Sequence, residues 1–420
     1  MPRAIGIDFG TTNSVVALLH DDGSTSTHRF ASGAALLDVF RSVLCFWSEE
    51  GRGRRILHHA SGPAAIDEWL QDPLDSRLIM SMKTYLAQGS FTETRVFGQV
   101  FTLQRLIGYF LRDLLDGAGA APRVVVGRPV RFAGEFADDA LGVTRLRGAY
   151  AAAGLPEVTL ALEPEAAGRR FARTLTDPAN VLIGDFGGGT SDFSVLRFEP
   201  GPQGRVTPLG HAGIGIAGDV FDYRIIDRVI SPLLGKGDSF RVMGKWLPVP
   251  VEYFSGFARW HLLSLMRTPQ TLRAIADVAR TAEHPRRLHH LLGLIEDGMG
   301  YALYQAVSAA KAELSRSEST VLRFQHRELA IEQTVARVDF EAWIAGELAR
   351  LGATVDQALA AARLSAGEID HVFLTGGTAF VPAVRRLFVD RFGEHRVAGG
   401  GEFVSVAEGL ALMGAGMEGA

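Results

Sequence analysis

The chain has 420 residues and nearly balanced charge, 43 lysines and arginines against 47 aspartates and glutamates, for a formal net charge of −4. This length predicts several domains, and the charge argues against a general nucleic-acid or anionic-membrane binder, which usually shows a basic excess. Because Cys45 is the single cysteine and no uncharged run approaches a membrane span or a signal-peptide core, we expect a cytoplasmic chain with no internal disulfide or cysteine metal cluster.

The first predicted element is a hairpin at residues 5–18, IGIDFGTTNSVVAL. An apolar strand ends in Asp8-Phe9-Gly10, a short polar turn follows, and a second apolar strand returns. Residues 181–196, VLIGDFGGGTSDFSVL, repeat this plan. Asp8 and Asp185 are 177 residues apart, so the chain is predicted to consist of two related halves.

The two hairpins have the composition of a phosphate-binding site. Glycines allow close approach of the backbone to a ligand and positive φ angles, so that successive amide groups can bind phosphate oxygens. Threonine hydroxyls add donors, and an aspartate at each strand end suits Mg²⁺, which prefers oxygen ligands and keeps several waters. The pattern is neither a P-loop nor a Rossmann fingerprint, because it lacks the P-loop lysine motif and a strand follows the glycines.

A third element completes the set. Residues 370–375 read as a short strand, Gly376-Gly377-Thr378 follows, and residues 381–388 begin a helix with proline in its first turn. A di-glycine here is either a tight turn or a surface on which a base or ribose lies.

Together these segments resemble the actin-type ATPase superfamily and, within it, the DnaK family of seventy-kilodalton heat-shock chaperones. VVVGRPV (124–130), LEPEAAG (162–168) and the segment 210–222 occur in the order expected for that family's nucleotide domain. The residues in these motifs most resemble those of the short YegD-type members. The resemblance implies an α/β, actin-like fold of two lobes, each with a duplicated ribonuclease-H-like mixed sheet, and a nucleotide in the central cleft.

The resemblance also implies the site residues. Asp8 and Asp185 would hold Mg²⁺, mainly through waters, while Lys83 would steady the γ-phosphate and the attacking water beside Glu163. Thr190 would complete the catalytic group. ATP or ADP would be bound by residues from both halves, namely Gly10, Thr11, Thr12, Gly187, Gly188, Gly189, Gly218, Asp219, Lys311, Ser315, Gly376, Gly377 and Thr378.

Departures from the family pattern concern the base. Ser308 and Ala312 stand where a glutamate and an arginine are usual, Phe380 replaces an arginine, and Phe403 stands near an expected aspartate. Arginine stacking on adenine would then be missing.

The domain organisation follows from the same resemblance. We expect lobe I at 1–177 with an inserted subdomain at about 33–105, and lobe II at 178–399 with an insertion at about 217–318. Residues 400–420 would form a helix returning to lobe I, with no peptide-binding domain. Trp246 to Trp260 is either packed among helices or an exposed partner surface.

The resulting hypothesis is a monomeric, Mg²⁺-dependent ATPase related to chaperones, with a protein client or co-chaperone of unknown identity. The alternative is a nucleotide-gated binding or regulatory module with little turnover. Two further hypotheses are a small-molecule kinase and a filament-forming, actin-like protein.

Overall fold

The computed structural model describes residues 1–32, 35–51, 54–72, 75–132, 137–172, 177–199, 205–258, 266–399 and 405–415. The chain divides into two compact units. Unit 1 comprises Met1–Gly215, Leu351–Ala379 and Val384–Ala420, and unit 2 comprises Ile216–Arg350 and Phe380–Ala383.

The first sheet of unit 1 is built on the predicted N-terminal hairpin, in which β1 (Ala4–Phe9) and β2 (Asn13–Leu19) are antiparallel. β3 (Thr25–Thr27) pairs antiparallel with β2, while β12 (Val124–Arg128) and β13 (Thr159–Leu162) extend the sheet in parallel beyond β1. The resulting order is β13-β12-β1-β2-β3.

The second sheet of unit 1 repeats this topology. Its strands are β14 (Ala179–Phe186), β15 (Ser191–Glu199), β16 (Arg205–Ile214), β21 (His371–Thr375) and β22 (Val397–Gly399), in the order β16-β15-β14-β21-β22. The first three strands again form an antiparallel meander and the last two again add in parallel. The predicted α/β fold of the actin type, with a duplicated mixed sheet, is confirmed.

The register shows how close the repetition is. Asp8 lies opposite Val15 in the first hairpin, and Asp185 lies opposite Asp192 in the second. Both members of the second pair are 177 residues beyond their counterparts, so the two hairpins have connecting loops of the same length. This offset is the one that the sequence pattern predicts.

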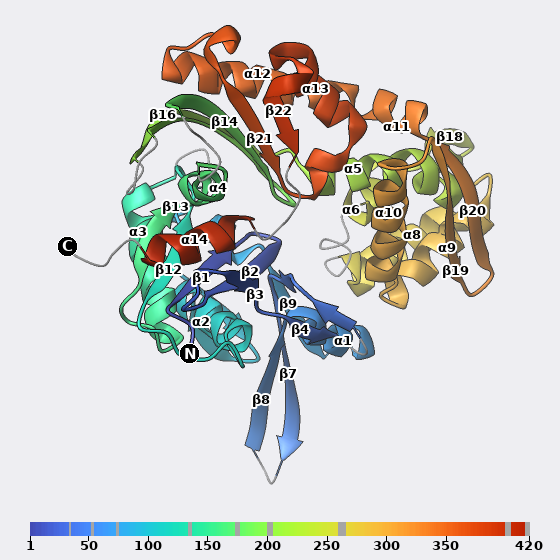
Figure 1. Ribbon diagram of the computed structural model, residues 1–420. Helices are drawn as coiled ribbons and strands as arrows, with labels where there is room; N and C mark the ends of the chain where they lie inside the picture. Colours follow the sequence, from blue (N-terminus) through green and yellow to red (C-terminus); the bar gives the residue numbers. More distant parts are fainter. Residues whose placement is uncertain are drawn as a thin grey trace. The chain divides into compact units, whose positions relative to one another are not determined.

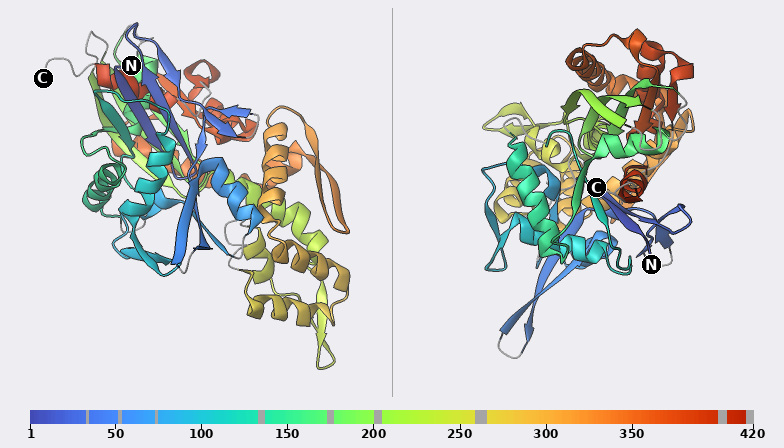
Figure 2. Two further views of the ribbon diagram at one scale, coloured as in Figure 1. Left: turned by 90° about the horizontal axis from the view of Figure 1, so that it is seen from below. Right: turned by 60° about the vertical axis from the view of Figure 1, so that its left-hand side comes forward.

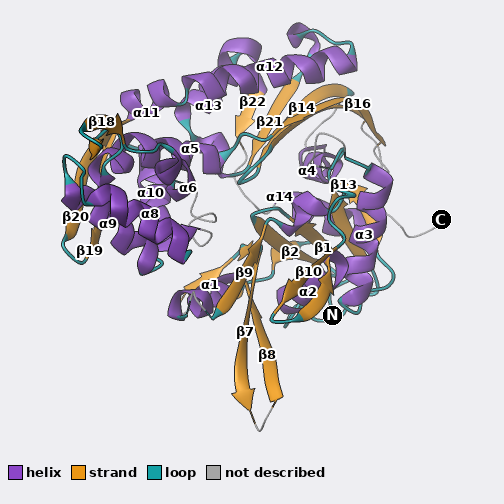
Figure 3. Ribbon diagram, turned by 180° about the vertical axis from the view of Figure 1, so that it is seen from behind, coloured by secondary structure: helices purple, strands orange, loops and turns teal. Residues whose placement is uncertain are grey.

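Helices cover both faces of the first sheet, as Figure 3 shows. Ile5 and Ile7 belong to a core that includes side chains of α2 (Leu103–Leu114) and α3 (Asp139–Ala152). On the other face, Ala4 packs with α14 (Ser405–Ala415), which also contacts α4 (Glu163–Ala172).

Further elements complete unit 1. α13 (Pro382–Phe392) packs Phe388 against Phe186 and Phe193 of the second sheet. Figure 1 shows β7 (Val43–Gly51) and β8 (Arg54–Ser61) as a long hairpin extending from the first sheet. The remaining elements are β4 (Phe30–Ser32), β5 (Ala35–Leu37), β6 (Phe40–Arg41), α1 (Gly62–Gln71), β9 (Ser76–Met80), the 3₁₀ helix η1 (Met82–Tyr85), β10 (Glu93–Val96), β11 (Gln99–Thr102), η4 (Ala366–Glu368), η5 (Gly377–Phe380) and η6 (Glu394–Arg396).

Unit 2 is mostly helical, with two small hairpins (Figure 2). The hairpin of β19 (Ser319–His326) and β20 (Leu329–Ala336) packs through β19 on α10 (Gly300–Leu314). The other elements are α5 (Gly218–Ile225), the π-helix η2 (Ile226–Ile230), η3 (Ser231–Leu234), β17 (Ser239–Val242), β18 (Lys245–Pro248), α6 (Glu252–Phe257), α8 (Pro269–Ala279), α9 (Pro285–Glu296) and α11 (Arg337–Trp343), while α12 (Ala345–Ala362) begins in unit 2 and ends in unit 1.

The segment from Trp246 to Trp260 is partly exposed. Trp246 is 58% exposed and Met243 is 99% exposed, at the turn between β17 and β18. Trp260 lies outside the described residues. Among the helices of the described part of the chain, none is both long and apolar enough to cross a membrane.

Candidate active site

The two hairpin loops of unit 1 lie against each other. Residues 10–13 lie beyond the last strand pair of the first hairpin, Phe9 with Ser14, and residues 187–190 lie beyond that of the second, Phe186 with Ser191. A Cβ atom added at Gly188 would lie 2.1 Å from Thr12 Oγ1, so the two loops are in direct contact there. This approach brings Asp8 and Asp185, near the ends of their strands, to one site.

The glycines of the loops mainly allow neighbouring segments of the chain to approach the backbone closely. Of the six glycines predicted around the phosphates, only Gly376 has a positive φ, +88°, and a Cβ atom there would lie 2.0 Å from the Phe186 carbonyl oxygen. A left-handed φ is absent at Gly10, Gly187, Gly188, Gly189 and Gly377. At Gly10 and Gly188 the requirement is space, because neighbouring atoms occupy the position of a side chain.

The strand β21 places the third predicted element beside the second hairpin. Thr375 lies opposite Asp185 in the parallel pair of β14 and β21, so Gly376 and Gly377 follow directly at that edge. Thr378 is buried in η5. The carboxyl ends of adjacent parallel strands are the usual location of ligand sites in open α/β sheets.

Lys83 and Glu163 form a partly buried ion pair at this site. Lys83 Nζ donates a hydrogen bond of 2.6 Å to Glu163 Oε1, and the two side chains are only 10% and 11% exposed. Burial alone would lower the pKa of Lys83, but the charges of Glu163 and Asp8 outweigh it and raise the pKa above its usual value. Lys83 is therefore a permanent cation at neutral pH.

The aspartates of the site carry unusual pKa values. Burial, followed by the charge of Glu163, raises the pKa of Asp8 to about 8. The same two causes raise the pKa of Asp185 to about 7. Both carboxyl groups therefore hold their protons more readily than a free aspartate does, and an added cation would favour their ionised forms.

The carboxylates of the site are of the kind that fits Mg²⁺. Asp8 and Asp185 bring two carboxylates within interaction range of each other, and oxygen ligands are those that Mg²⁺ prefers. Within the described ranges, no three His, Cys, Asp or Glu side chains converge closely enough to enclose a metal ion directly.

Asp192 is a site residue that the sequence interpretation missed. It lies opposite Asp185, and burial, followed by the charge of Glu163, raises its pKa to about 7. The Thr190 side chain hydrogen-bonds to it. His211 Nε2 is 3.6 Å from Asp192 Oδ1, and Ser194 Oγ is 3.1 Å from His211 Nδ1. The sequence does contain a signal for it. Residue 192 lies 177 residues after Val15, which is also the offset between Asp8 and Asp185, and it is an acid where the first hairpin has a valine.

Tyr150 on α3 is a second residue that was missed. It is fully buried, and its hydroxyl has no hydrogen-bond partner within the described structure. Burial, together with the charges of Asp8 and Glu163, raises its pKa well above the usual value. A buried donor without a partner near two acids indicates room for a bound water or ligand oxygen.

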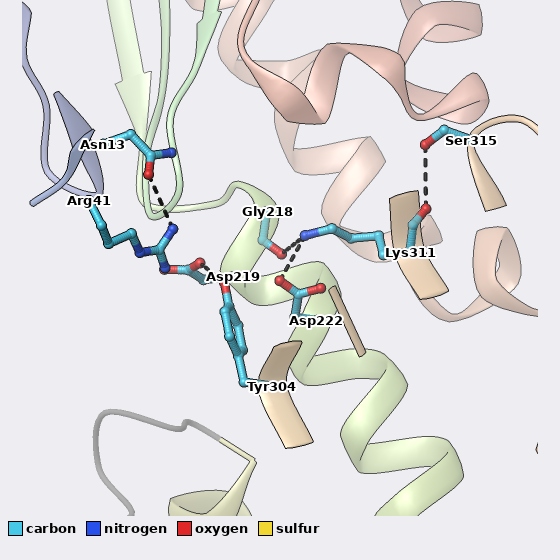
Figure 4. A network of polar contacts seen from close by, with 8 residues as sticks. All are labelled: Asn13, Arg41, Gly218, Asp219, Asp222, Tyr304, Lys311 and Ser315. Carbon is cyan, nitrogen blue, oxygen red and sulfur yellow. Dashed lines mark hydrogen bonds and ion pairs between the residues drawn. The ribbon is translucent and has the colours of Figure 1, made fainter. Parts of the chain in front are cut away.

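Four further predicted residues belong to unit 2 and are among those labelled in Figure 4, namely Gly218, Asp219, Lys311 and Ser315. Lys311 Nζ donates to the Gly218 carbonyl at 3.0 Å and to Asp222 Oδ2 at 2.7 Å. The Ser315 hydroxyl caps the Lys311 carbonyl at 3.4 Å, and Tyr304 donates to Asp219 Oδ1 at 3.1 Å. Lys311 is thus engaged within the protein.

The residues that depart from the family pattern are only partly described. Phe380 is 55% exposed at the end of η5. Phe403 lies outside the described residues.

Comparisons with known proteins support the resemblance. A family model described as "Hsp70 protein" matches residues 296–420. Two relatives named "Chaperone protein DnaK" align with nearly the whole chain: that of Deinococcus deserti is 25% identical, covering 94% of this chain and 56% of the relative, and that of Thermotoga petrophila is 27% identical, covering 99% and 60%. The chain therefore spans less than two thirds of the length of these relatives.

Proposed function

Because this chain is a relative of the Hsp70 proteins, we propose that it binds ATP with Mg²⁺ and hydrolyses it to ADP and phosphate. The observation that carries this proposal is the meeting of Asp8, Asp185 and the Lys83–Glu163 pair at two contacting loops of unit 1. That this chain most resembles the short YegD-type members of the family stays a prediction.

The chain's own residues suit phosphoryl transfer, which requires positioning and charge neutralisation more than covalent chemistry. Lys83 remains protonated, so it acts as a fixed positive charge toward the terminal phosphate and not as a base. Glu163 holds that ammonium group in place at 2.6 Å. Mg²⁺, when bound, supplies further positive charge for the phosphate oxygens.

The carboxylates provide acceptors for water. Asp8, Asp185 and Asp192 have pKa values near or above neutrality, so each can accept a proton from a water at the site when it is ionised, and can hydrogen-bond to that water in either form. The backbone of the loops 10–13 and 187–190 offers amide donors for phosphate oxygens. Residues 1–177 and 178–399 are proposed as the two lobes, as the resemblance implies.

The remaining parts of the proposal concern context. We infer that a protein client or co-chaperone contacts this chain, that it works as a monomer in the cytoplasm, and that Gly218, Asp219, Lys311 and Ser315 face the nucleoside. These inferences rest on the resemblance alone.

The test is Mg²⁺-dependent phosphate release. We expect turnover by the wild type and its near-complete loss in Lys83→Ala and Asp185→Asn. Matched controls are Lys245→Ala on β18 and Asp21→Asn in an exposed turn, which should behave as the wild type. Equal rates in all five proteins would refute the proposal. A thermal shift with ATP but no phosphate release would instead favour the nucleotide-gated binding module.

A further inference from the structure

Arg145, on helix α3, has a buried guanidinium group that contacts the loop following Lys83. Arg145 is only 8% exposed. Its Nη1 donates to the carbonyl oxygens of Tyr85 at 3.1 Å, Leu86 at 3.3 Å and Gln88 at 2.9 Å, and its Nη2 donates to that of Phe91 at 2.6 Å. One side chain thus satisfies four backbone acceptors.

These acceptors begin at the last residue of η1, the short helix that carries Lys83. Before Lys83, Ser81 has a φ of +54°, a left-handed conformation that residues other than glycine rarely adopt, and its carbonyl accepts from the Thr84 amide at 3.0 Å. After it, the Leu86 amide donates to the Lys83 carbonyl at 3.2 Å. The Asp138 amide, at the start of α3, donates to the Ala87 carbonyl at 3.0 Å, so α3 holds the same loop at a second point.

We propose that Arg145 is a positioning residue for Lys83, fixing the backbone of η1 so that the ammonium group meets Glu163. The proposal rests on the proposed function only for the consequence in turnover. Arg145 itself contacts neither Lys83 nor the carboxylates of the site in any described hydrogen bond. It acts through the loop.

The chemistry of the side chain explains why arginine stands here. A guanidinium group presents several donors in a rigid plane, whereas the ammonium group of lysine is a compact charge with three donors. Loss of the group would remove one donor from all four carbonyl oxygens. Those of Tyr85 and Gln88 would keep the backbone amides of Gln88 and Phe91, at 3.2 Å each, whereas those of Leu86 and Phe91 would need a new partner, and buried acceptors without partners are costly. The loop would then rearrange to reach water, and Lys83 would move with it.

The variants are Arg145→Met, which removes the donors, and Arg145→Lys, which keeps the charge. The control is Arg396→Met, because Arg396 Nη1 makes a similar contact set in unit 1 with the carbonyls of Ala366 at 3.5 Å, Gly367 at 3.1 Å and Ile369 at 2.9 Å. That loop carries none of the proposed site residues. Folding of each protein is checked by circular dichroism and melting temperature.

The first measurement is the reactivity of the Lys83 amine. The sequence contains four lysines, and Lys245 is exposed, so it serves as the internal reference for acylation followed by mass spectrometry. In the wild type Lys83 should react slowly, because it is paired with Glu163. In Arg145→Met the ratio of Lys83 to Lys245 acylation should rise several-fold, with a smaller rise in Arg145→Lys and none in Arg396→Met.

The second measurement is ATP turnover. A displaced Lys83 should lower kcat by at least about tenfold in Arg145→Met while KM for ATP changes little, because misplacement of a catalytic group by about 1 Å is costly. An unchanged acylation ratio in folded Arg145→Met and Arg145→Lys would overturn the proposal. If the wild type shows no turnover, the proposed function fails, and the acylation ratio still decides the role of Arg145.

Discussion

The two hairpins of unit 1 share one backbone plan but differ in the side chains they present. The first offers Thr11 and Thr12 in its loop and an apolar residue, Val15, opposite its aspartate. The second offers three successive glycines in its loop and a second acid, Asp192, opposite Asp185.

This difference shows how a repeated unit becomes a site with two unequal halves. The register, the loop length and the aspartate are common to both, so each half brings a carboxylate to the same place. The second hairpin has more backbone without side chains, in its three loop glycines, and one more acidic side chain, Asp192. The first half instead brings hydroxyls and, through the segment inserted after β2, Lys83.

The strongest test of the common plan replaces each aspartate in turn. Asp8→Asn and Asp185→Asn should each lower Mg²⁺-dependent phosphate release by more than about 100-fold, because each removes a carboxylate that would hold Mg²⁺ at the reacting phosphate. Comparable losses, measured as phosphate release over a range of Mg²⁺ concentrations, would show that both halves contribute. Retained activity in one variant would show that only the other half serves the reaction.

A smaller effect is expected from alanine in the glycine loop. A Cβ atom at Gly188 would lie 2.1 Å from Thr12 Oγ1, whereas Gly189 has open space around it. Gly188→Ala should therefore lower kcat/KM by about tenfold through displaced loops. Gly189→Ala should stay close to the wild type, and similar losses in both variants would contradict the packing argument.

The acids of the site also predict a pH dependence of stability. The pKa of Asp8 rises from 3.8 to about 8, and those of Asp185 and Asp192 rise to about 7, so their contribution to stability is fully present below pH 3.8 and is lost as pH rises through 7 to 8. His211, whose pKa burial lowers from 6.5 to about 4, costs stability only below pH 6.5.

The measurement is urea unfolding without Mg²⁺ at pH 6.5 and pH 8.5. We expect lower stability at pH 8.5 from these groups, and a larger stabilisation by added Mg²⁺ there than at pH 6.5. A rise in stability over this range, with Asp8→Asn behaving identically, would argue against the raised pKa values.

The smallest effect is expected when the second hairpin is made like the first. Asp192→Val places at position 192 the residue found opposite Asp8. Without Mg²⁺ at pH 8.5 the variant should unfold at a higher urea concentration than the wild type, because one repelling carboxylate is gone. Its stabilisation by Mg²⁺ should be weaker. Asp21→Asn, in an exposed turn, controls for a general charge effect.

Much of the fold could be predicted because the pattern of each hairpin is local. Apolar residues, a Gly-containing turn and returning apolar residues specify β1 with β2 and β14 with β15, and the 177-residue offset shows the repetition. The pairing of β14 with β21 could not be obtained in this way, because it joins Asp185 to Thr375 across a long intervening sequence.

The site was less predictable for a related reason. Lys83 has no local signal, because a single lysine in a turn looks like any surface residue, and only the resemblance assigned it. Arg145 and Tyr150 were missed because a charged or polar residue in a helix is usually solvated, and their burial depends on the loop and core that pack against α3. The crowding at Gly188 could not be predicted from its own segment, because it comes from Thr12 in a distant loop.

The packing of α14 has a consequence for biosynthesis. The Ala4 face of β1 is covered by Ala407 and Ala411, and a Cβ atom at Gly6 would lie 2.1 Å from the Ala407 carbonyl oxygen. β1 is therefore translated early but stays uncovered on that face until residues 405–415 have left the ribosome. Contacts of such sequence separation form slowly, and the exposed strand is open to misassociation meanwhile. We expect the first sheet to be among the last parts of the nascent chain to become protected from proteolysis.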